Sequence, residues 1–154
     1  MQNQSYAYDF IGKLTSRADV SAVPGMNVTE TFDYDGGNRL ITSVVKQNIT
    51  SLTPKAVSYN PVGNIVMKSD VGNYAYPGAG AARPHGVLSI SGGVLSTSFT
   101  YDPNGNQLSG NGITYTYTSY DKPSVIARGS SASTFVHEEG NSGQLHFRSY
   151  RHAG

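Results

Sequence analysis

The sequence predicts an all-β protein built from successive antiparallel β-hairpins that form a curved sheet. Two observations point to this fold. The 154 residues include 18 glycines and 11 tyrosines, with frequent Thr, Ser and Val, and these residue types favour turns and half-buried strands over helices. A tyrosine-containing segment also recurs along the chain, and each copy runs into turn-forming residues.

The recurring segment has an apolar residue, any residue, Tyr, Asp or Asn, two variable residues, Gly or Asn, and then an aliphatic residue. Four copies are clear, and two weaker ones centre on Tyr76 and Tyr117. The six anchor tyrosines are separated by 26, 25, 17, 25 and 16 residues, which suits hairpins with outer loops of variable length. The positions that define the four clear copies are Tyr8, Asp9, Gly12, Tyr34, Asp35, Asn38, Tyr59, Asn60, Gly63, Tyr101, Asp102 and Gly105.

The residues after each tyrosine predict a specific turn. In Asp102-Pro103-Asn104-Gly105, Asp accepts a local backbone hydrogen bond, Pro presets φ at the second position and Gly suits the fourth. A type I turn followed by a left-handed residue makes a three-residue hairpin loop with a G1 bulge. In the second copy Asn38 takes the left-handed position, which Asn tolerates best after Gly.

Composition limits the partners that we expect. The net charge is +1 and the basic residues are scattered, so the sequence lacks the basic patch with which proteins bind nucleic acid, and we expect no nucleic-acid partner. No apolar run approaches the roughly 18 residues of a membrane span, and no signal peptide is visible at the N-terminus. The absence of cysteine excludes disulfides and thiolate metal sites.

One group of metal-ligand residue types is present, in the C-terminal tail. The spacings between its histidines lack the compact register of a zinc motif, so we expect a solvated tail without a metal site. The group consists of His137, His146 and His152 with Glu138 and Glu139.

The other candidates for chemistry are explained by structure. Gly78-Ala79-Gly80 lacks the Gly-Lys-Ser or Gly-Lys-Thr ending of a phosphate-binding loop. The aspartates that follow anchor tyrosines open turns, and no serine lies in a Gly-x-Ser-x-Gly elbow. We therefore predict no catalytic residue, no cofactor and no bound metal.

Aromatic residues of the repeats are expected on one face of the sheet, where cross-strand ring contacts would stabilise it. The alternative is that exposed rings stack on sugars, for which the candidates are Tyr101, Tyr115 and Tyr117. The predicted aromatic face comprises Tyr6, Tyr8, Phe32, Tyr34, Tyr59, Phe99, Tyr101, Tyr115 and Tyr117.

These segments resemble the YD repeats of Rhs and related proteins, a family of bacterial polymorphic toxins, toxin-complex subunits and teneurins. The stretch from Tyr74 to Val87, with Arg83-Pro84-His85-Gly86, resembles the Gly-rich Pro-His segment between repeats. The resemblance covers about residues 6 to 128. It implies a β-shell, or cocoon, that encloses a variable toxin; in other members the repeats lie outside the cell and contact carbohydrate.

The resemblance implies residues 1–128 as a repeat segment and residues 129–154 as a divergent tail, truncated or disordered. It implies a non-catalytic structural segment that encloses or scaffolds a secreted toxin, located outside the cell as part of a larger protein. Its partners would be the remaining shell or the toxin cargo. Two alternatives stay open: a carbohydrate- or cell-surface-binding module, and an effector enzyme with its active site in the tail.

Overall fold

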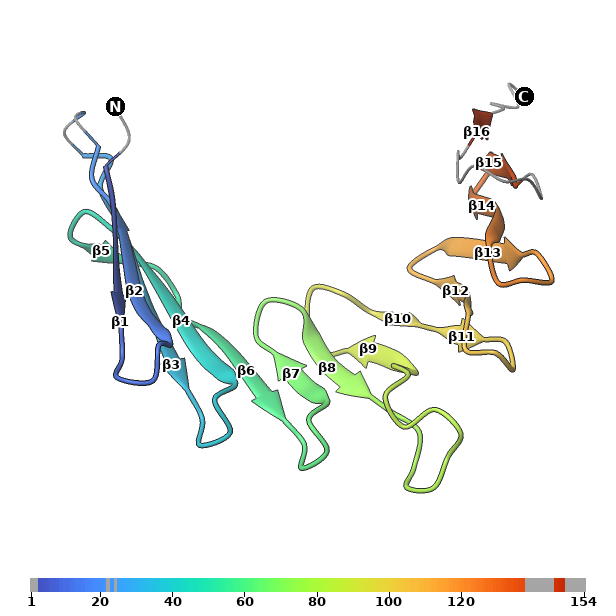
Figure 1. Cartoon of the computed structure of the whole chain (residues 1–154), viewed down its shortest axis with the longest axis horizontal. Coiled ribbons are helices and arrows are strands. Elements are labelled where there is room, and N and C mark those ends of the chain that lie inside the picture. Colours follow the sequence, from blue (N-terminus) through green and yellow to red (C-terminus); the bar gives the residue numbers. More distant parts are fainter. Residues whose placement is uncertain (1–2, 22, 24, 138–145, 149–154) are drawn as a thin grey trace. The chain divides into compact units, whose positions relative to one another are not determined.

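The computed structural model describes residues 3–21, 23, 25–137 and 146–148, all of them in strands, turns and loops (Figure 1). The predicted all-β fold of antiparallel hairpins is confirmed. The described part of the chain contains no helix that could cross a membrane. The strands are β1 (Gln4–Tyr8), β2 (Leu14–Asp19), β3 (Val28–Tyr34), β4 (Leu40–Gln47), β5 (Thr50–Ser51), β6 (Lys55–Tyr59), β7 (Ile65–Lys68), β8 (Gly72–Ala75), β9 (Ser89–Ser91), β10 (Thr97–Ser98), β11 (Thr100–Tyr101), β12 (Gln107–Gly110), β13 (Ile113–Tyr117), β14 (Pro123–Arg128), β15 (Ser131–Val136) and β16 (His146–Arg148).

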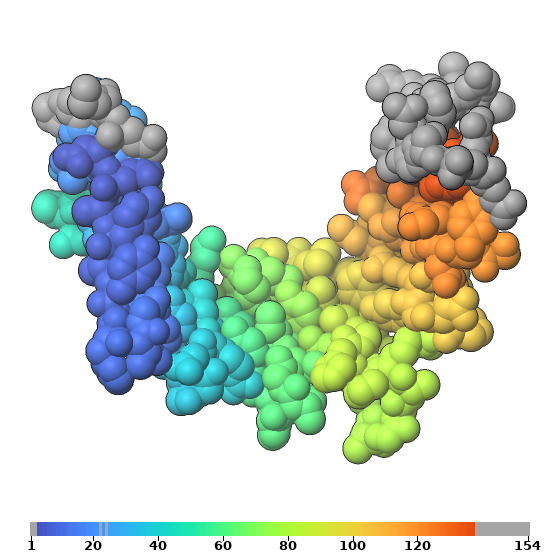
Figure 2. All heavy atoms as spheres, in the orientation of Figure 1, coloured from blue at the N-terminus to red at the C-terminus, as the bar shows by residue number. Residues whose placement is uncertain are grey.

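The chain divides into two compact units, Met1–Asn73 and Tyr74–Gly154. In the first unit the strands pair in the order β1-β2-β3-β4-β6-β7-β8, and β5 pairs with β4. Every pair is antiparallel, so the unit is a run of hairpins in one sheet. The three repeat turns of this unit lie along one margin of it, in blue, cyan and green in Figure 2.

In the second unit, β9 pairs with β10, and β11 to β16 form a six-stranded sheet in chain order. A loop over residues 77–88 precedes β9, and the Leu88 N–H donates to the Ala75 carbonyl at 2.8 Å. The repeat hairpins of this unit therefore follow the same up-and-down plan.

The predicted turn type is confirmed at each clear copy of the repeat. The strand register shifts at the anchor tyrosine, as a bulge requires, so that Tyr8 lies opposite Leu14 and Tyr101 opposite Gln107. A fifth copy at Thr118–Asp121 has the same shift. The fourth residues of the five turns have positive φ: Gly12 (86°), Asn38 (62°), Gly63 (91°), Gly105 (94°) and Asp121 (61°).

Tighter turns connect some of the other strand ends. Gly110 lies opposite Ile113, so Asn111 and Gly112 form a two-residue loop, with φ of 52° and 71°. Asn-Gly is the strongest short hairpin signal in a sequence, so this turn was predictable although we did not predict it.

Side-chain burial is sparse. Among the described residues Ile90 is the one buried hydrophobic side chain, 7% exposed, and Asn64 the one buried polar side chain, 8% exposed. Most strand residues are half-buried or exposed; in β4 the first six residues are all half-buried, whereas in β13 Tyr115 and Tyr117 are half-buried and Thr114 and Thr116 exposed. The described sheets are thus partly covered and enclose almost no buried core.

The sheet continues past the boundary expected at residue 128. Gly129 and Ser130 form a turn between β14 and β15, which pair from Arg128 opposite Ser131 to Val125 opposite Thr134. The expected tail therefore begins inside a hairpin. Its residues 138–145 and 149–154, which include Glu138, Glu139 and His152, lie outside the described part of the chain.

Candidate functional site

The five repeat turns, residues 9–12, 35–38, 60–63, 102–105 and 118–121, share one hydrogen-bond pattern. In each, the first residue exchanges two backbone hydrogen bonds of 2.8 to 3.1 Å, as when Asp9 N–H donates to Lys13 and Asp9 C=O accepts from Gly12. The side chain of the first residue accepts a further N–H four residues on. These bonds are Lys13 to Asp9 at 2.8 Å, Arg39 to Asp35 at 2.9 Å, Asn64 to Asn60 at 2.9 Å, Asn106 to Asp102 at 2.8 Å and Lys122 to Thr118 at 3.1 Å.

These hydrogen bonds lower the pKa of the turn aspartates. The backbone N–H of Arg39 holds the pKa of Asp35 below its ordinary value, and the side-chain amide of Asn106 does the same for the pKa of Asp102. At Asp9 burial acts to raise the pKa, but the N–H groups of Lys13 and Ile11 outweigh it and lower the pKa. The carboxylates close turns, which is the role predicted from the sequence.

The anchor tyrosines form a second regular feature, here called the tyrosine ladder. In four of the six anchors the hydroxyl donates to a backbone carbonyl of the preceding repeat or loop, and in three of these four the acceptor is the first residue of the strand that follows a repeat turn. The ladder therefore ties each hairpin to the one before it. Its bonds are Tyr34 to Leu14 at 2.8 Å, Tyr59 to Leu40 at 2.9 Å, Tyr101 to Val87 at 3.0 Å and Tyr117 to Gln107 at 2.9 Å.

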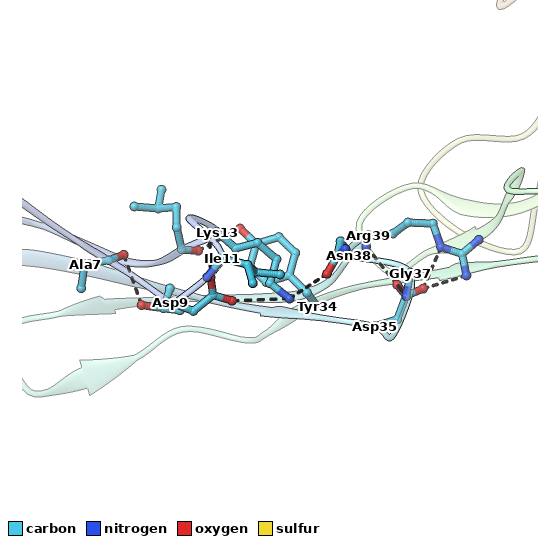
Figure 3. A network of polar contacts seen from close by, with 11 residues as sticks. Ala7, Asp9, Ile11, Lys13, Tyr34, Asp35, Gly37, Asn38 and Arg39 are labelled. Carbon is cyan, nitrogen blue, oxygen red and sulfur yellow. Dashed lines mark hydrogen bonds and ion pairs between the residues drawn. The ribbon is translucent and has the colours of Figure 1, made fainter.

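Cations cover the faces of three ladder tyrosines. Lys13 Nζ lies 5.1 Å from the ring centroid of Tyr34, and the Arg39 guanidinium lies 4.6 Å from that of Tyr59. Lys13 and Arg39 also pair with the aspartates of their own turns, at 3.5 Å from Asp9 and 2.7 Å from Asp35 respectively (Figure 3). One basic side chain thus joins its own turn to the next tyrosine.

Neighbouring turns are also linked directly. Lys13 Nζ donates to the Asn38 side chain at 3.1 Å, joining the first turn to the second (Figure 3). In the second unit, Asn104 and Asn106 donate to the Asp121 carboxylate at 2.9 and 2.7 Å. The repeat residues thus bind one another along the row of turns.

The Gly-rich stretch before β9 has a part in the ladder. Its Arg83 lies over the Tyr101 ring, 5.7 Å from the centroid, and donates to the Asp102 carbonyl. The carbonyl of Val87 accepts the Tyr101 hydroxyl. Within the second unit this loop replaces the preceding repeat turn. Gly78 makes a local turn in it, accepting the Ala81 N–H at 3.2 Å.

His137, which we expected in a solvated tail, takes the place of an anchor tyrosine in the ladder. Its Nε2 lies 2.8 Å from the carbonyl of Pro123, the first residue of the strand that follows the fifth turn. Extending the β14–β15 register places His137 opposite Lys122, just as Tyr34 falls opposite Lys13. Because a carbonyl only accepts, Nε2 carries the proton. The missed signal is Phe135-Val-His137, which parallels Phe99-Thr-Tyr101.

The described residues contain no group of three metal-ligand side chains. His137 also contacts Tyr120 edge to face, with ring centroids 6.2 Å apart. His146 belongs to β16, for which the structure describes the backbone alone. Glu138, Glu139 and His152 lie outside the described residues.

The aromatic residues of the repeats do not contact one another across strands as we predicted. Tyr120 and His137 form a ring–ring pair, but among the described residues no such pair joins two members of the predicted aromatic face, so the expected cross-strand stacking of repeat tyrosines is wrong. The physical reason is register, because each anchor tyrosine lies opposite a non-aromatic residue, such as Leu14 or Gln107. Of the proposed sugar-stacking residues, Tyr101 and Tyr117 use their hydroxyls in the ladder, and Tyr115 is half-buried on the same strand as Tyr117.

A groove of about 760 Å³ lies on the face of β1 to β4 in the first unit. It crosses a row of register partners in which Tyr6 lies opposite Arg17, Arg17 opposite Glu30 and Glu30 opposite Val45. Arg17 and Glu30 form an ion pair at 2.6 Å, and Tyr6 is 52% exposed. This groove could not be predicted from the sequence, because its residues come together only through strand register.

No protein-family model matches this chain, and no curated protein matches it. Its role must therefore be inferred from the tyrosine ladder, the repeat turns and the exposure of the sheet.

Proposed function

We propose that the chain is a non-catalytic structural segment of an Rhs-type YD-repeat shell, which encloses or scaffolds a secreted toxin as part of a larger extracellular protein. The tyrosine ladder carries this proposal. Its hydroxyls and the turn carboxylates, the groups best suited to chemistry in the repeat, are bonded to backbone or to neighbouring turns. The repeated residues therefore serve to hold hairpins in register.

The sparse burial supports the same role. A sheet with one buried hydrophobic side chain among its described residues gains little from its own core. Large apolar side chains such as Phe10, Ile49 and Val94 are 88% to 98% exposed. The remaining shell or its cargo would cover such surface, and these are the partners that we propose.

The test uses the full chain alone at low micromolar concentration, in light scattering after size exclusion and in binding of a hydrophobic dye. We expect self-association and strong dye binding, because open strand edges and apolar side chains are exposed. A monodisperse monomer that melts sharply and binds no dye would overturn the proposal.

The groove beside Tyr6 favours carbohydrate recognition as a second candidate function. Sugars bind through an exposed ring together with fixed polar groups, and here Tyr6 adjoins the Arg17–Glu30 pair and Gln4. A glycan array should then detect binding that Tyr6→Ala and Arg17→Ala abolish, while Tyr120→Ala, outside the groove, leaves it unchanged. Absence of glycan binding, or binding insensitive to both groove variants, rejects this candidate.

A further inference from the structure

The tip of the β12–β13 hairpin carries a dipeptide with chemistry of its own. Asn-Gly occurs twice in the sequence, as Asn104-Gly105 in the fourth repeat turn and as Asn111-Gly112 in the two-residue loop between β12 and β13. An asparagine side chain lies within reach of the next backbone nitrogen, and a glycine leaves that nitrogen open to approach because it has no side chain. The two copies place one reaction in two different surroundings.

At Asn111-Gly112 the groups that would react are free. Both residues are exposed, and a side chain built on Gly112 would meet nothing within 4 Å. Among the described residues no group bonds the side-chain amide of Asn111 or the N–H of Gly112. The bonds of the loop are made instead by the backbone of Asn111, whose N–H donates to Thr97 Oγ1 at 2.8 Å. No hydrogen bond of the described structure therefore competes with attack of the Gly112 nitrogen on the Asn111 side chain.

A cation lies on the peptide group that would react. The Arg128 guanidinium donates to the Asn111 carbonyl at 3.3 Å, and this carbonyl belongs to the same peptide group as the Gly112 nitrogen. Strand register brings Arg128 there, because it lies opposite Ile113. Loss of the Gly112 amide proton moves negative charge onto that carbonyl oxygen, which a permanently charged guanidinium stabilises. Arg128 therefore raises the fraction of the Gly112 nitrogen that is in its reactive, deprotonated form.

Asn104-Gly105 has the opposite surroundings. The Gly105 N–H donates to the Asp102 carbonyl at 3.1 Å as part of the repeat turn, and the Asn104 side chain donates to the Asp121 carboxylate at 2.9 Å. Deprotonation of Gly105 would break the turn bond, and the carboxylates of Asp102 and Asp121 disfavour a further negative charge beside them. The fourth repeat turn therefore protects the same dipeptide.

We propose that Asn111-Gly112 is a self-modification site, at which the chain converts asparagine to aspartate and isoaspartate without an enzyme and Arg128 accelerates the reaction. The Gly112 nitrogen gives its proton to hydroxide and bonds to the side-chain carbonyl carbon of Asn111. The bond from that carbon to the amide nitrogen breaks, and the nitrogen leaves as ammonia after taking a proton from water. Water then opens the succinimide ring at either carbonyl. One product is aspartate, and the other is isoaspartate, in which the main chain runs through the former side chain.

The isoaspartate product lengthens the main chain of the loop by one carbon. Gly110 and Ile113 pair directly across this two-residue loop, in which both residues have positive φ, 52° and 71°. A loop with an added main-chain atom does not fit such a tight turn, so the pairing of β12 with β13 weakens. The bond from the Tyr117 hydroxyl to Gln107 spans the same two strands. Modification at the tip therefore loosens one step of the tyrosine ladder.

The test incubates the full chain in mildly alkaline buffer and follows both dipeptides by peptide mapping and mass spectrometry, which separates aspartate from isoaspartate. We expect Asn111 to react about tenfold faster than Asn104, the effect of the hydrogen bonds that hold the second dipeptide. Arg128→Met should slow the reaction of Asn111 about threefold, the contribution of one exposed charge, and leave Asn104 unchanged. Arg128→Lys keeps the charge and should retain most of the rate. In urea the two dipeptides should react at similar rates, and the effect of Arg128 should vanish.

Equal rates at the two dipeptides in the folded chain, or a faster reaction at Asn104, overturn the self-modification site. An Asn111 rate that Arg128→Met leaves unchanged, or that both Arg128 variants slow equally, overturns the role of the arginine charge. Slowing by Arg128→Met that persists in urea overturns it as well, because the effect would not depend on strand register. None of these outcomes bears on the proposed shell function, which self-association and dye binding test separately.

Discussion

At the scale of single residues, the anchor tyrosine combines two roles that a phenylalanine cannot. Its ring half-covers one face of the sheet, and its hydroxyl bonds the backbone of the preceding hairpin. The residue after it, usually Asp, closes the turn through its side chain. The Tyr-Asp pair therefore makes two contacts: the tyrosine binds the preceding repeat, and the aspartate closes the turn of its own repeat.

Tyr117 and Tyr115 test the ladder within one strand. The Tyr117 hydroxyl donates to Gln107, whereas that of Tyr115 has no partner among the described residues. We expect Tyr117→Phe to destabilise the β12–β13 pair by about 1 kcal/mol, seen as roughly fivefold faster amide exchange there, and Tyr115→Phe to change exchange little. Equal effects of the two variants would contradict the ladder.

His137 offers a second test at this scale. His137→Phe keeps a ring but removes the donor to Pro123, so amides of β14 and β15 should exchange several-fold faster. His137→Tyr restores a donor at an anchor position and should retain most of the protection. If both variants lose protection equally, the histidine acts through packing on Tyr120 and not through the ladder.

At the scale of elements, each hairpin depends on one left-handed residue that ends the turn. A side chain built on Gly63 would meet nothing within 4 Å, so only its φ of 91° restricts substitution. Asn38 holds the same position in the second turn at 62°. Backbone conformation, and not space, selects these residues.

Substitution of Gly63 tests this explanation. Gly63→Ala should destabilise the β6–β7 hairpin by about 1 to 2 kcal/mol, the usual cost of a left-handed alanine, and Gly63→Asn by clearly less. The measurement is amide exchange in β6 and β7. Gly36→Ala is the control, because Gly36 has open space and a φ outside the positive range. An alanine at Gly63 as benign as one at Gly36 would contradict the turn assignment.

At the scale of the whole molecule, stability should fall in acid. The pKa of Asp9, Asp35 and Asp102 is lowered in the folded chain, so these carboxylates stabilise it above their unfolded pKa, about 3.9, and lose that contribution as pH falls through the lower folded values. The urea midpoint, followed by tyrosine fluorescence, should be nearly constant from pH 7 to 5 and drop below about pH 4.

A triple variant provides the control for this acid sensitivity. Asn60 closes the third turn with an amide that does not titrate, so Asp9→Asn, Asp35→Asn and Asp102→Asn together should fold and show a flatter midpoint below pH 4. An acid response identical to that of the wild type would place the titrating groups elsewhere.

The sequence by itself determined the local structure of this protein. Tyr-Asp-x-x-Gly specifies hairpin, turn type and bulge from contacts four residues apart, so the all-β fold and the four clear turns followed from short-range chemistry. The fifth turn follows a copy of the repeat that is weak in the sequence, because Thr118 and Asp121 replace the usual Asp and Gly.

Only the tertiary structure decided which residues meet across the sheet. Strand register sets the acceptor of each tyrosine hydroxyl 10 to 20 residues back in the chain, brings Arg83 over Tyr101 and puts His137 in an anchor position. The same register creates the groove at Tyr6. Local turn energies do not specify these pairings, since they depend on loops of variable length between strands.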